Sequence, residues 1–255
     1  MKIAIWKKTI LNTACASLLL PASLLLPATL AFADDHSHDH PHDHGDNPVL
    51  TRVIIDQLEL RNADGANPIA LEAQAWIGKD LNKLWLKTDV ERRDGETEEA
   101  EVQALYSRAL APFWDIQMGV RYDAKPTPTR TWGVIGVQGL APYWFEIDTA
   151  LFVGESGRTA ARFSAEYELL FTQKLILTPS VEVNVYGQND VETGTGSGLS
   201  DAKAGLRLRY EIRREFAPYI GVNWNKKFGK TADFVKSEGE AVSDTELVVG
   251  LRAWF

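Results

Sequence analysis

The sequence predicts an all-β protein, a transmembrane antiparallel up-and-down β-barrel of about twelve strands that follows a disordered histidine-rich tail. After Pro48, apolar and polar residues alternate with a period of two, which is typical of strands with two different faces. No apolar run in this part approaches the roughly 20 residues of a membrane helix, so a spanning structure must be a closed barrel. Links of different length separate the segments, as in a barrel of hairpins.

The first 33 residues have the layout of a secretory signal peptide. Three lysines precede an apolar stretch from Ile10 to Phe32, and small residues surround the expected cleavage site after Ala33. An uncleaved membrane helix is the alternative, which two internal prolines weaken. We therefore expect a signal peptide at residues 1–33, a metal-binding tail at 34–48 and an outer-membrane barrel at 49–255.

Charge and cysteine content limit the classes of partner. The chain has a formal net charge of −8, and its only cysteine, Cys15, lies in the expected leader. An acidic chain without a basic stripe argues against nucleic acid as a partner. The mature chain would have no thiol for a disulfide, a thiolate metal site or nucleophilic catalysis. Metal ions and membrane lipid are the expected partners.

Twelve segments alternate over the length of a membrane strand, which is roughly 9 to 11 residues. In residues 181–186, for example, valine occupies every second position. In residues 130–139 the outward face stays open, because Ile135 and Val137 compete with Trp132 and Val134 for it. The predicted strands are 50–61, 68–79, 83–93, 98–109, 113–123, 130–139, 143–154, 158–171, 174–187, 200–213, 217–228 and 244–255.

The links predict the two ends of the barrel. Short turns would be periplasmic together with both termini, and longer polar links would be extracellular. Aromatic residues follow an Ala-Pro pair at Phe113, Tyr143 and Tyr219, which indicates an interfacial girdle. A final amphipathic strand ending in Phe255 resembles the signal that the barrel-insertion machinery reads. The short turns are expected near 80–82, 111–112, 141–142, 172–173 and 215–216, and the longer links at 61–68, 92–98, 123–129, 188–199 and 229–243.

Alternation alone does not say which face is wet. In a soluble sandwich or lipocalin-like barrel the apolar faces would point inward. The leader, the number of strands, the links and the chain end favour a barrel in the outer membrane of a Gram-negative bacterium, with charged residues inside. The expected interior residues are Glu72, Asp89, Glu91, Glu99, Glu101, Asp115, Arg121, Glu146, Asp148, Arg162, Glu166, Glu168, Glu182, Lys203, Arg207, Arg209, Glu211 and Arg252.

These interior charges allow two interpretations. Acidic residues two apart on a strand face the same way, and facing arginines such as Arg162, Arg207 and Arg209 would neutralise them as a structural network. The alternative is an acidic path or weak cation site of hard oxygen ligands, which suits Cu(I) poorly. The acidic pairs are Asp89 with Glu91, Glu99 with Glu101, and Glu166 with Glu168.

The tail contains all five histidines of the chain, at every second position. Neutral imidazole binds copper, zinc and nickel, and neighbouring carboxylates raise the local cation concentration. A solvated linker of biased composition is the alternative. The predicted metal ligands are Asp34, Asp35, His36, His38, His40, His42 and His44.

Cleavage after Ala33 would place Asp34, Asp35 and His36 at the new N-terminus. The free amine, two deprotonated amide nitrogens and the imidazole of His36 would then form a square-planar site. Such nitrogen ligation favours Cu(II) or Ni(II) over zinc. We expect one Cu(II) there, with further ions bound more loosely by His38 to His44.

Four stretches closely resemble the copper resistance protein B family. They are LWLKTDVE at 84–91, QALYSRALAPFWDIQMGVRYD at 103–123, GVQGLAPYWFEIDTALFVGESGR at 136–158 and GLSDAKAGLRLRYEIRREFAPYIGVNWNKKFG at 198–229. The resemblance implies an outer-membrane barrel in a periplasmic copper-detoxification system, beside a multicopper oxidase. Members often have methionine in the tail, whereas Met118 is the single methionine of the mature chain, which shifts the expected cargo to Cu(II), with zinc and nickel as alternatives.

The expected function is therefore copper resistance, through capture of periplasmic copper and its sequestration or export. The alternatives are an outer-membrane pore for cations whose tail only tunes entry, and a structural barrel whose tail docks a periplasmic partner. We predict no enzymatic activity, because a Ser-His hydrolase at the barrel mouth needs a histidine and none follows His44.

Overall fold

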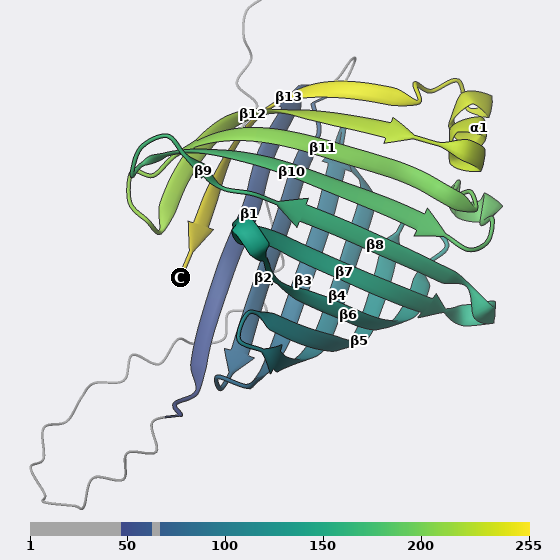
Figure 1. Ribbon diagram of the computed structural model, residues 1–255. Helices are drawn as coiled ribbons and strands as arrows, with labels where there is room; N and C mark the ends of the chain where they lie inside the picture. Colours follow the sequence, from purple (N-terminus) through teal and green to yellow (C-terminus); the bar gives the residue numbers. More distant parts are fainter. Residues whose placement is uncertain (1–46, 63–66) are drawn as a thin grey trace, which may run out of the picture. The chain divides into compact units, whose positions relative to one another are not determined.

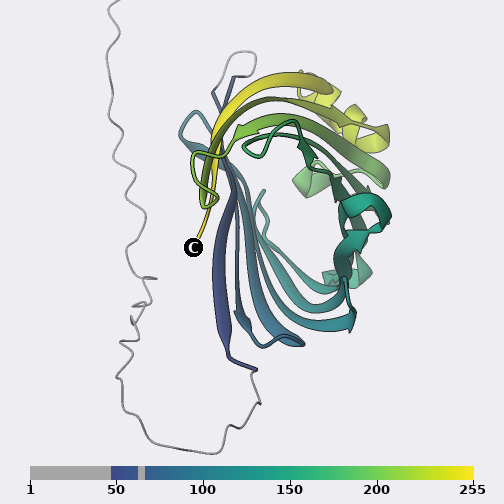
Figure 2. The ribbon, with the colours of Figure 1, turned by 60° about the vertical axis from the view of Figure 1, so that its left-hand side comes forward.

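The computed structural model describes residues 47–62 and 67–255. Their strands form one antiparallel sheet, in which each strand pairs with its neighbours in the chain, except that β8 and β9 do not pair with each other (Figure 1). Strand β1 pairs with β13, and β10 pairs with β11, so the sheet closes on itself (Figure 2). The segments β8 and β9 both pair with β10 and form one interrupted strand. The predicted barrel of about twelve strands is confirmed.

The strand bounds agree closely with the predicted segments. No helix among the described residues is long and apolar enough to cross a membrane. The strands are β1 Leu50–Asn62, β2 Ile69–Gly78, β3 Asn82–Arg93, β4 Glu96–Ala111, β5 Trp114–Lys125, β6 Arg130–Ala141, β7 Phe145–Gly154, β8 Thr159–Glu166, β9 Leu169–Leu170, β10 Leu175–Tyr186, β11 Gly198–Tyr210, β12 Phe216–Lys227 and β13 Ser243–Trp254. Short 3-10 turns η1 Pro142–Trp144, η2 Glu155–Gly157 and η3 Val191–Thr193, and one α-helix, α1 Gly229–Ser237, lie in the links.

Two local predictions were wrong, and one predicted link contains a helix that was not predicted. The predicted strand 158–171 is split into β8 and β9, because Pro179 on β10 accepts a hydrogen bond from the Tyr167 amide at 3.1 Å but has no N–H to return. The predicted link 92–98 is a tight turn, in which Asp94 and Gly95 have positive φ values of 51° and 87°, as two-residue hairpins require. Helix α1 occupies part of the predicted polar link 229–243.

The barrel has two distinct ends. We call the end where β1 begins the turn end; there the links β2 to β3, β4 to β5, β6 to β7, β9 to β10 and β11 to β12 are short. The other end, the loop end, carries the link between β10 and β11 and the α1 link between β12 and β13 (Figure 1). The links β10 to β11 and β12 to β13 match the predicted longer links, whereas the Asp94-Gly95 turn and the links 126–129 and 155–158 are as short as those of the turn end.

The two faces of the sheet differ as a membrane barrel requires. Large apolar side chains such as Val120, Leu151 and Ile220 are more than half exposed on the outside. Gln117 and Arg121, in contrast, are nearly inaccessible inside the barrel. This distribution is the reverse of a soluble core, so the apolar face is the one that meets lipid.

Candidate functional site

The predicted metal ligands Asp34, Asp35, His36, His38, His40, His42 and His44 lie outside the described residues. Within residues 47–62 and 67–255, no group of three or more His, Cys, Asp and Glu side chains is arranged to hold a metal ion. The part of the candidate site that the structure shows is the interior of the barrel.

The interior is lined by the charged residues that alternation predicts. A cavity of about 620 Å³ lies within it. The predicted interior residues that line this cavity are Glu72, Asp89, Glu91, Glu101, Glu146, Asp148, Arg162, Glu166, Glu182, Lys203, Arg207, Arg209 and Arg252.

Arginines neutralise many of the interior carboxylates, as the first interpretation predicted. Glu101 on β4 accepts two hydrogen bonds from Arg162 on β8, at 3.1 and 2.9 Å. Arg121 on β5 lies 2.8 Å from the same carboxylate. Arg209 lies 2.7 Å from Glu168. Because Glu101 and Arg162 lie on strands that are not neighbours, their ion pair braces the interior of the barrel.

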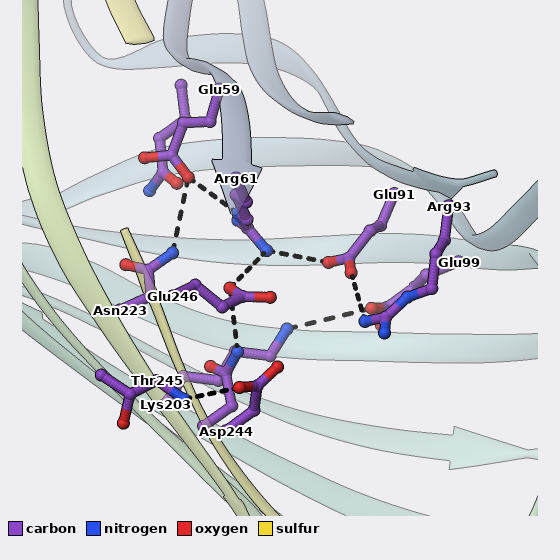
Figure 3. A network of polar contacts seen from close by, with 12 residues as sticks. Glu59, Arg61, Glu91, Arg93, Glu99, Lys203, Asn223, Asp244, Thr245 and Glu246 are labelled. Atoms are coloured by element: carbon purple, nitrogen blue, oxygen red, sulfur yellow. Dashed lines mark hydrogen bonds and ion pairs between the residues drawn. The ribbon is translucent and has the colours of Figure 1, made fainter. Parts of the chain in front are cut away.

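Arg61 on β1 is the centre of a network near the loop end (Figure 3). Its Nε atom donates to Glu59 at 2.9 Å, and its Nη1 atom donates to Glu91 at 2.9 Å. The same Nη1 atom lies 3.8 Å from Glu246, which accepts a hydrogen bond from Asn225 at 3.3 Å. Glu59 and Glu246 are each only 1% exposed, so Arg61 offsets charge that water does not reach.

Two cross-strand pairs of carboxylates have no ion pair among the described residues. Glu72 on β2 lies directly opposite Asp89 on β3, and Glu146 on β7 lies directly opposite Glu166 on β8. All four line the cavity. Like charges directly opposite each other repel, so these pairs make the cavity wall attractive to cations.

Apolar side chains also lie inside the barrel, which the sequence analysis did not predict. Trp85, Leu105, Trp132, Val134 and Phe152 form a buried cluster on strands β3, β4, β6 and β7. The register of β6 now resolves the undecided face, since Trp132 is buried and Ile135 is half exposed to the outside. Alternation alone could not show which face of β6 points outward, because both faces carry apolar residues.

The predicted aromatic girdle is only partly correct. Phe113 and Tyr143 are well exposed at the turn end, and Phe113 packs edge-to-face on Trp144 at 6.4 Å between ring centroids. Tyr219, however, is buried inside and donates its hydroxyl to Glu59 at 3.0 Å. Met118 is half exposed on the outer face, so its thioether does not serve the cavity.

Ion pairs at the loop end hold the link between β10 and β11. Asp190 in this link accepts hydrogen bonds from Arg130 on β6 at 2.9 and 3.1 Å, and Arg158 lies 3.2 Å away. Burial alone would raise the pKa of Asp190, but the hydrogen bonds and charge of Arg130, with the charge of Arg158, lower it below its ordinary value. The link is therefore tied to β6 and to the segment just before β8 at neutral pH.

Comparison with known structures shows the same kind of fold. The NanC porin matches with a TM-score of 0.54 and 12% identity, covering 80% of this chain and 99% of that chain. The KdgM porin matches with a TM-score of 0.51 and 12% identity, covering 81% of this chain and 99% of that chain. At this identity the similarity concerns the fold alone, which is that of an outer-membrane β-barrel.

Comparison with known sequences identifies the family. The family described as copper resistance protein B precursor (CopB) matches residues 49–255. Copper resistance protein B of Escherichia coli is 49% identical over 210 residues, which cover 82% of this chain and 71% of that protein. The copper resistance protein B homolog of Pseudomonas syringae pv. tomato is 46% identical over the same shares. The resemblance found in the sequence is confirmed, and the chain belongs to the copper resistance protein B family.

Proposed function

We propose that this outer-membrane barrel serves copper resistance by capturing copper ions in the periplasm and then sequestering or exporting them. The tail residues Asp34, Asp35, His36, His38, His40, His42 and His44 would bind the ions. The observation that carries the proposal is the concentration of all five histidines at residues 36–44 in a member of a copper resistance family. Imidazole and amide nitrogen are strong ligands for Cu(II).

The barrel and the tail would supply different chemistry. The sequence places no histidine or cysteine after residue 44, so the barrel itself offers only oxygen ligands and the charges that balance them. Hard oxygen ligands bind Cu(II) weakly and Cu(I) poorly. Tight capture would therefore belong to the tail, and the carboxylate-lined cavity would at most attract cations toward the barrel.

Titration of the mature protein with Cu(II) tests the capture step. With one equivalent of Cu(II) we expect the visible and circular-dichroism bands of a square-planar nitrogen site. The variant His36→Ala should lose these bands, whereas Ser37→Ala, its neighbour, should keep them. The proposal of tail capture would be wrong if the mature protein bound no Cu(II), or if His36→Ala left the spectrum unchanged.

Growth of a deletion strain tests the role in the cell. Full-length protein should restore growth on copper, and protein lacking residues 34–44 should restore much less. Parallel growth on zinc and nickel reports on selectivity. Full rescue by the tailless protein would instead support a barrel function that does not need the tail.

The second candidate is a pore for cations whose tail only tunes entry. The cavity and its unpaired carboxylates Glu72, Asp89, Glu146 and Glu166 favour it. A stable open channel that is unaffected by removal of residues 34–44 would support this candidate over capture by the tail.

A periplasmic multicopper oxidase is the proposed protein partner, following from the family resemblance. The nitrogen ligands of the tail would bind Cu(II), the oxidised state of the ion. Pull-down from periplasmic extract with and without copper tests this association; capture that is independent of both copper and the tail would contradict it.

A further inference from the structure

Two ion pairs that start on β4 cross the interior of the barrel. Glu101 is held by Arg162 on β8, and Glu99, two residues away on β4, lies 3.9 Å from Lys203 on β11. In the closed order of strands, β8 is four strands from β4, and β11 is six strands away on the opposite wall. Long side chains must therefore extend through the middle of the barrel at this level.

On β4 and β11 the lining of the cavity ends at this level. Glu101 lines the cavity, but Glu99, which is nearer the loop end of β4, does not. Lys203 likewise lines the cavity, whereas Asp201, nearer the loop end of β11, does not. On the other side the cavity extends toward the turn end, where Leu140 lines it. On β1 and β3 the lining extends further, to Arg61 and Glu91, which are joined at 2.9 Å. Ion pairs thus occupy the loop side of the chamber, those of Glu99 and Glu101 toward β11 and β8 and that of Arg61 toward β3.

Neighbouring side chains brace the ion pairs of Glu101. Arg121 lies 2.8 Å from Glu101 and 2.7 Å from Asp123, which accepts a hydrogen bond from the indole of Trp132 at 2.8 Å. The guanidinium group of Arg121 lies 4.8 Å from the ring centroid of Phe152. This packing leaves the ion pairs of Glu101 little freedom to separate.

Another pair crosses the interior without ending the cavity. Lys87 on β3 lies 2.7 Å from Asp148 on β7. Trp85 and Asp89, on either side of Lys87 along β3, both line the cavity. This pair narrows the chamber, whereas on β4 and β11 the lining ends at Glu101 and Lys203.

The two ion pairs that cross the interior differ in their exposure to water and therefore in strength. The Glu101 and Arg162 side chains are 5% and 18% exposed, while those of Glu99 and Lys203 are 41% and 37% exposed. Ion pairs that water reaches are weak, because solvent screens them. The Glu99–Lys203 pair therefore separates more easily than the Glu101–Arg162 pair.

We propose that the ion pairs Glu99–Lys203 and Glu101–Arg162 form a gate, which closes the lumen on its loop side and must rearrange before an ion crosses the barrel. The gate does not depend on which metal the tail binds. In the closed state, ions that enter from the turn end reach the chamber and its carboxylates but not the loop end.

Conductance of the purified full-length mature protein in planar lipid bilayers with potassium chloride tests the gate. The wild type should show little steady conductance. The double variant Lys203→Met/Arg162→Met should conduct severalfold more, and Lys203→Met alone should show brief openings. Lys230→Met, the same change in helix α1 outside the lumen, is the matched control and should behave as the wild type.

A second pair of variants separates gating from misfolding. Glu99→Gln/Glu101→Gln breaks the same ion pairs with side chains of nearly unchanged size and should also raise conductance. The variant Glu99→Lys/Lys203→Glu restores the weaker ion pair with its two charges exchanged, and it should conduct as little as the wild type. Circular dichroism checks the strand content of each variant. The gate is refuted if the wild type conducts as well as the double variants, or if neither double variant conducts more than the wild type.

Discussion

Arg207 on β11 donates through Nε to Glu59 on β1 at 2.7 Å, deep inside the barrel. The same carboxylate accepts hydrogen bonds from Arg61 at 2.9 Å and from the hydroxyl of Tyr219 at 3.0 Å. Glu59 thus binds two buried arginines. Its contacts join β1 to β11 and β12, which lie on the other side of the seam between β1 and β13.

Replacement of Glu59 by glutamine should strongly destabilise the barrel. The change removes the carboxylate that forms the ion pair with Arg207 and one of the carboxylates around Arg61, and breaking a buried pair costs about 3 to 5 kcal/mol. Glu98→Gln is the matched control, because the half-exposed Glu98 pairs with Arg93 at 3.1 Å and should contribute about 0 to 1 kcal/mol. Urea unfolding in lipid vesicles measures both, and equal losses would contradict the central role of Glu59.

Replacement of Gly154 by alanine should overpack the interior beside Trp132. A Cβ atom on Gly154 would lie 2.6 Å from the Trp132 ring, which its hydrogen bond to Asp123 holds in place. Overpacking of this kind costs about 1 to 3 kcal/mol. The nearest heavy atom to a Cβ on Gly133 would be 3.7 Å away, so Gly133→Ala should unfold like the wild type. Equal midpoints for the two variants would show that the ring is free to move.

An arginine introduced on the outer face should destabilise the barrel more than an arginine introduced in the interior. Ile135, which is 49% exposed near the middle of β6, faces lipid, and Ile135→Arg should destabilise the barrel by about 2 to 4 kcal/mol. Ser164→Arg adds the same side chain to the cavity wall that Asp148 and Glu166 also line, and its cost should be smaller. A larger loss for Ser164→Arg in vesicle unfolding would reverse the assignment of the two faces.

Acid should release the link between β10 and β11. Because the pKa of Asp190 is lowered in the folded protein, its stabilising contribution is fully present above the ordinary aspartate value of 3.8. The contribution is lost as pH falls through the lower folded pKa. Hydrogen-exchange protection of residues 190–195 should therefore fall in strong acid. Asp190→Asn should show low protection at every pH, and protection equal to the wild type would contradict the role of this contact.

The strands were predictable because alternation is local. Val181 and Glu182 are adjacent on one strand and therefore point to opposite faces. Because one is apolar and the other is charged, the sequence itself indicates which of them faces lipid. The interior partners were only partly predictable. That Arg162 would neutralise an acid followed from its face, but its pairing with Glu101 depends on barrel diameter and strand stagger, which no local pattern contains.

The remaining differences have local physical causes. Tyr219 follows an Ala-Pro pair like the girdle residues, yet the pleat of β12 turns it toward Glu59. The break at Tyr167 needs knowledge that Pro179 lies across from it, which is a property of the pairing. The tail remains a prediction from composition, since His36 and the residues around it lie outside the described part of the chain.

The seam between β1 and β13 affects how the barrel can assemble. Ile54 pairs with Trp254, so closure joins segments from nearly opposite ends of the sequence, and such distant contacts form slowly. Until they form, β1 and β13 each present an unsatisfied backbone edge that invites aggregation. Escort of the unfinished chain by a chaperone would therefore matter most between the completion of the hairpins and the joining of this last pair.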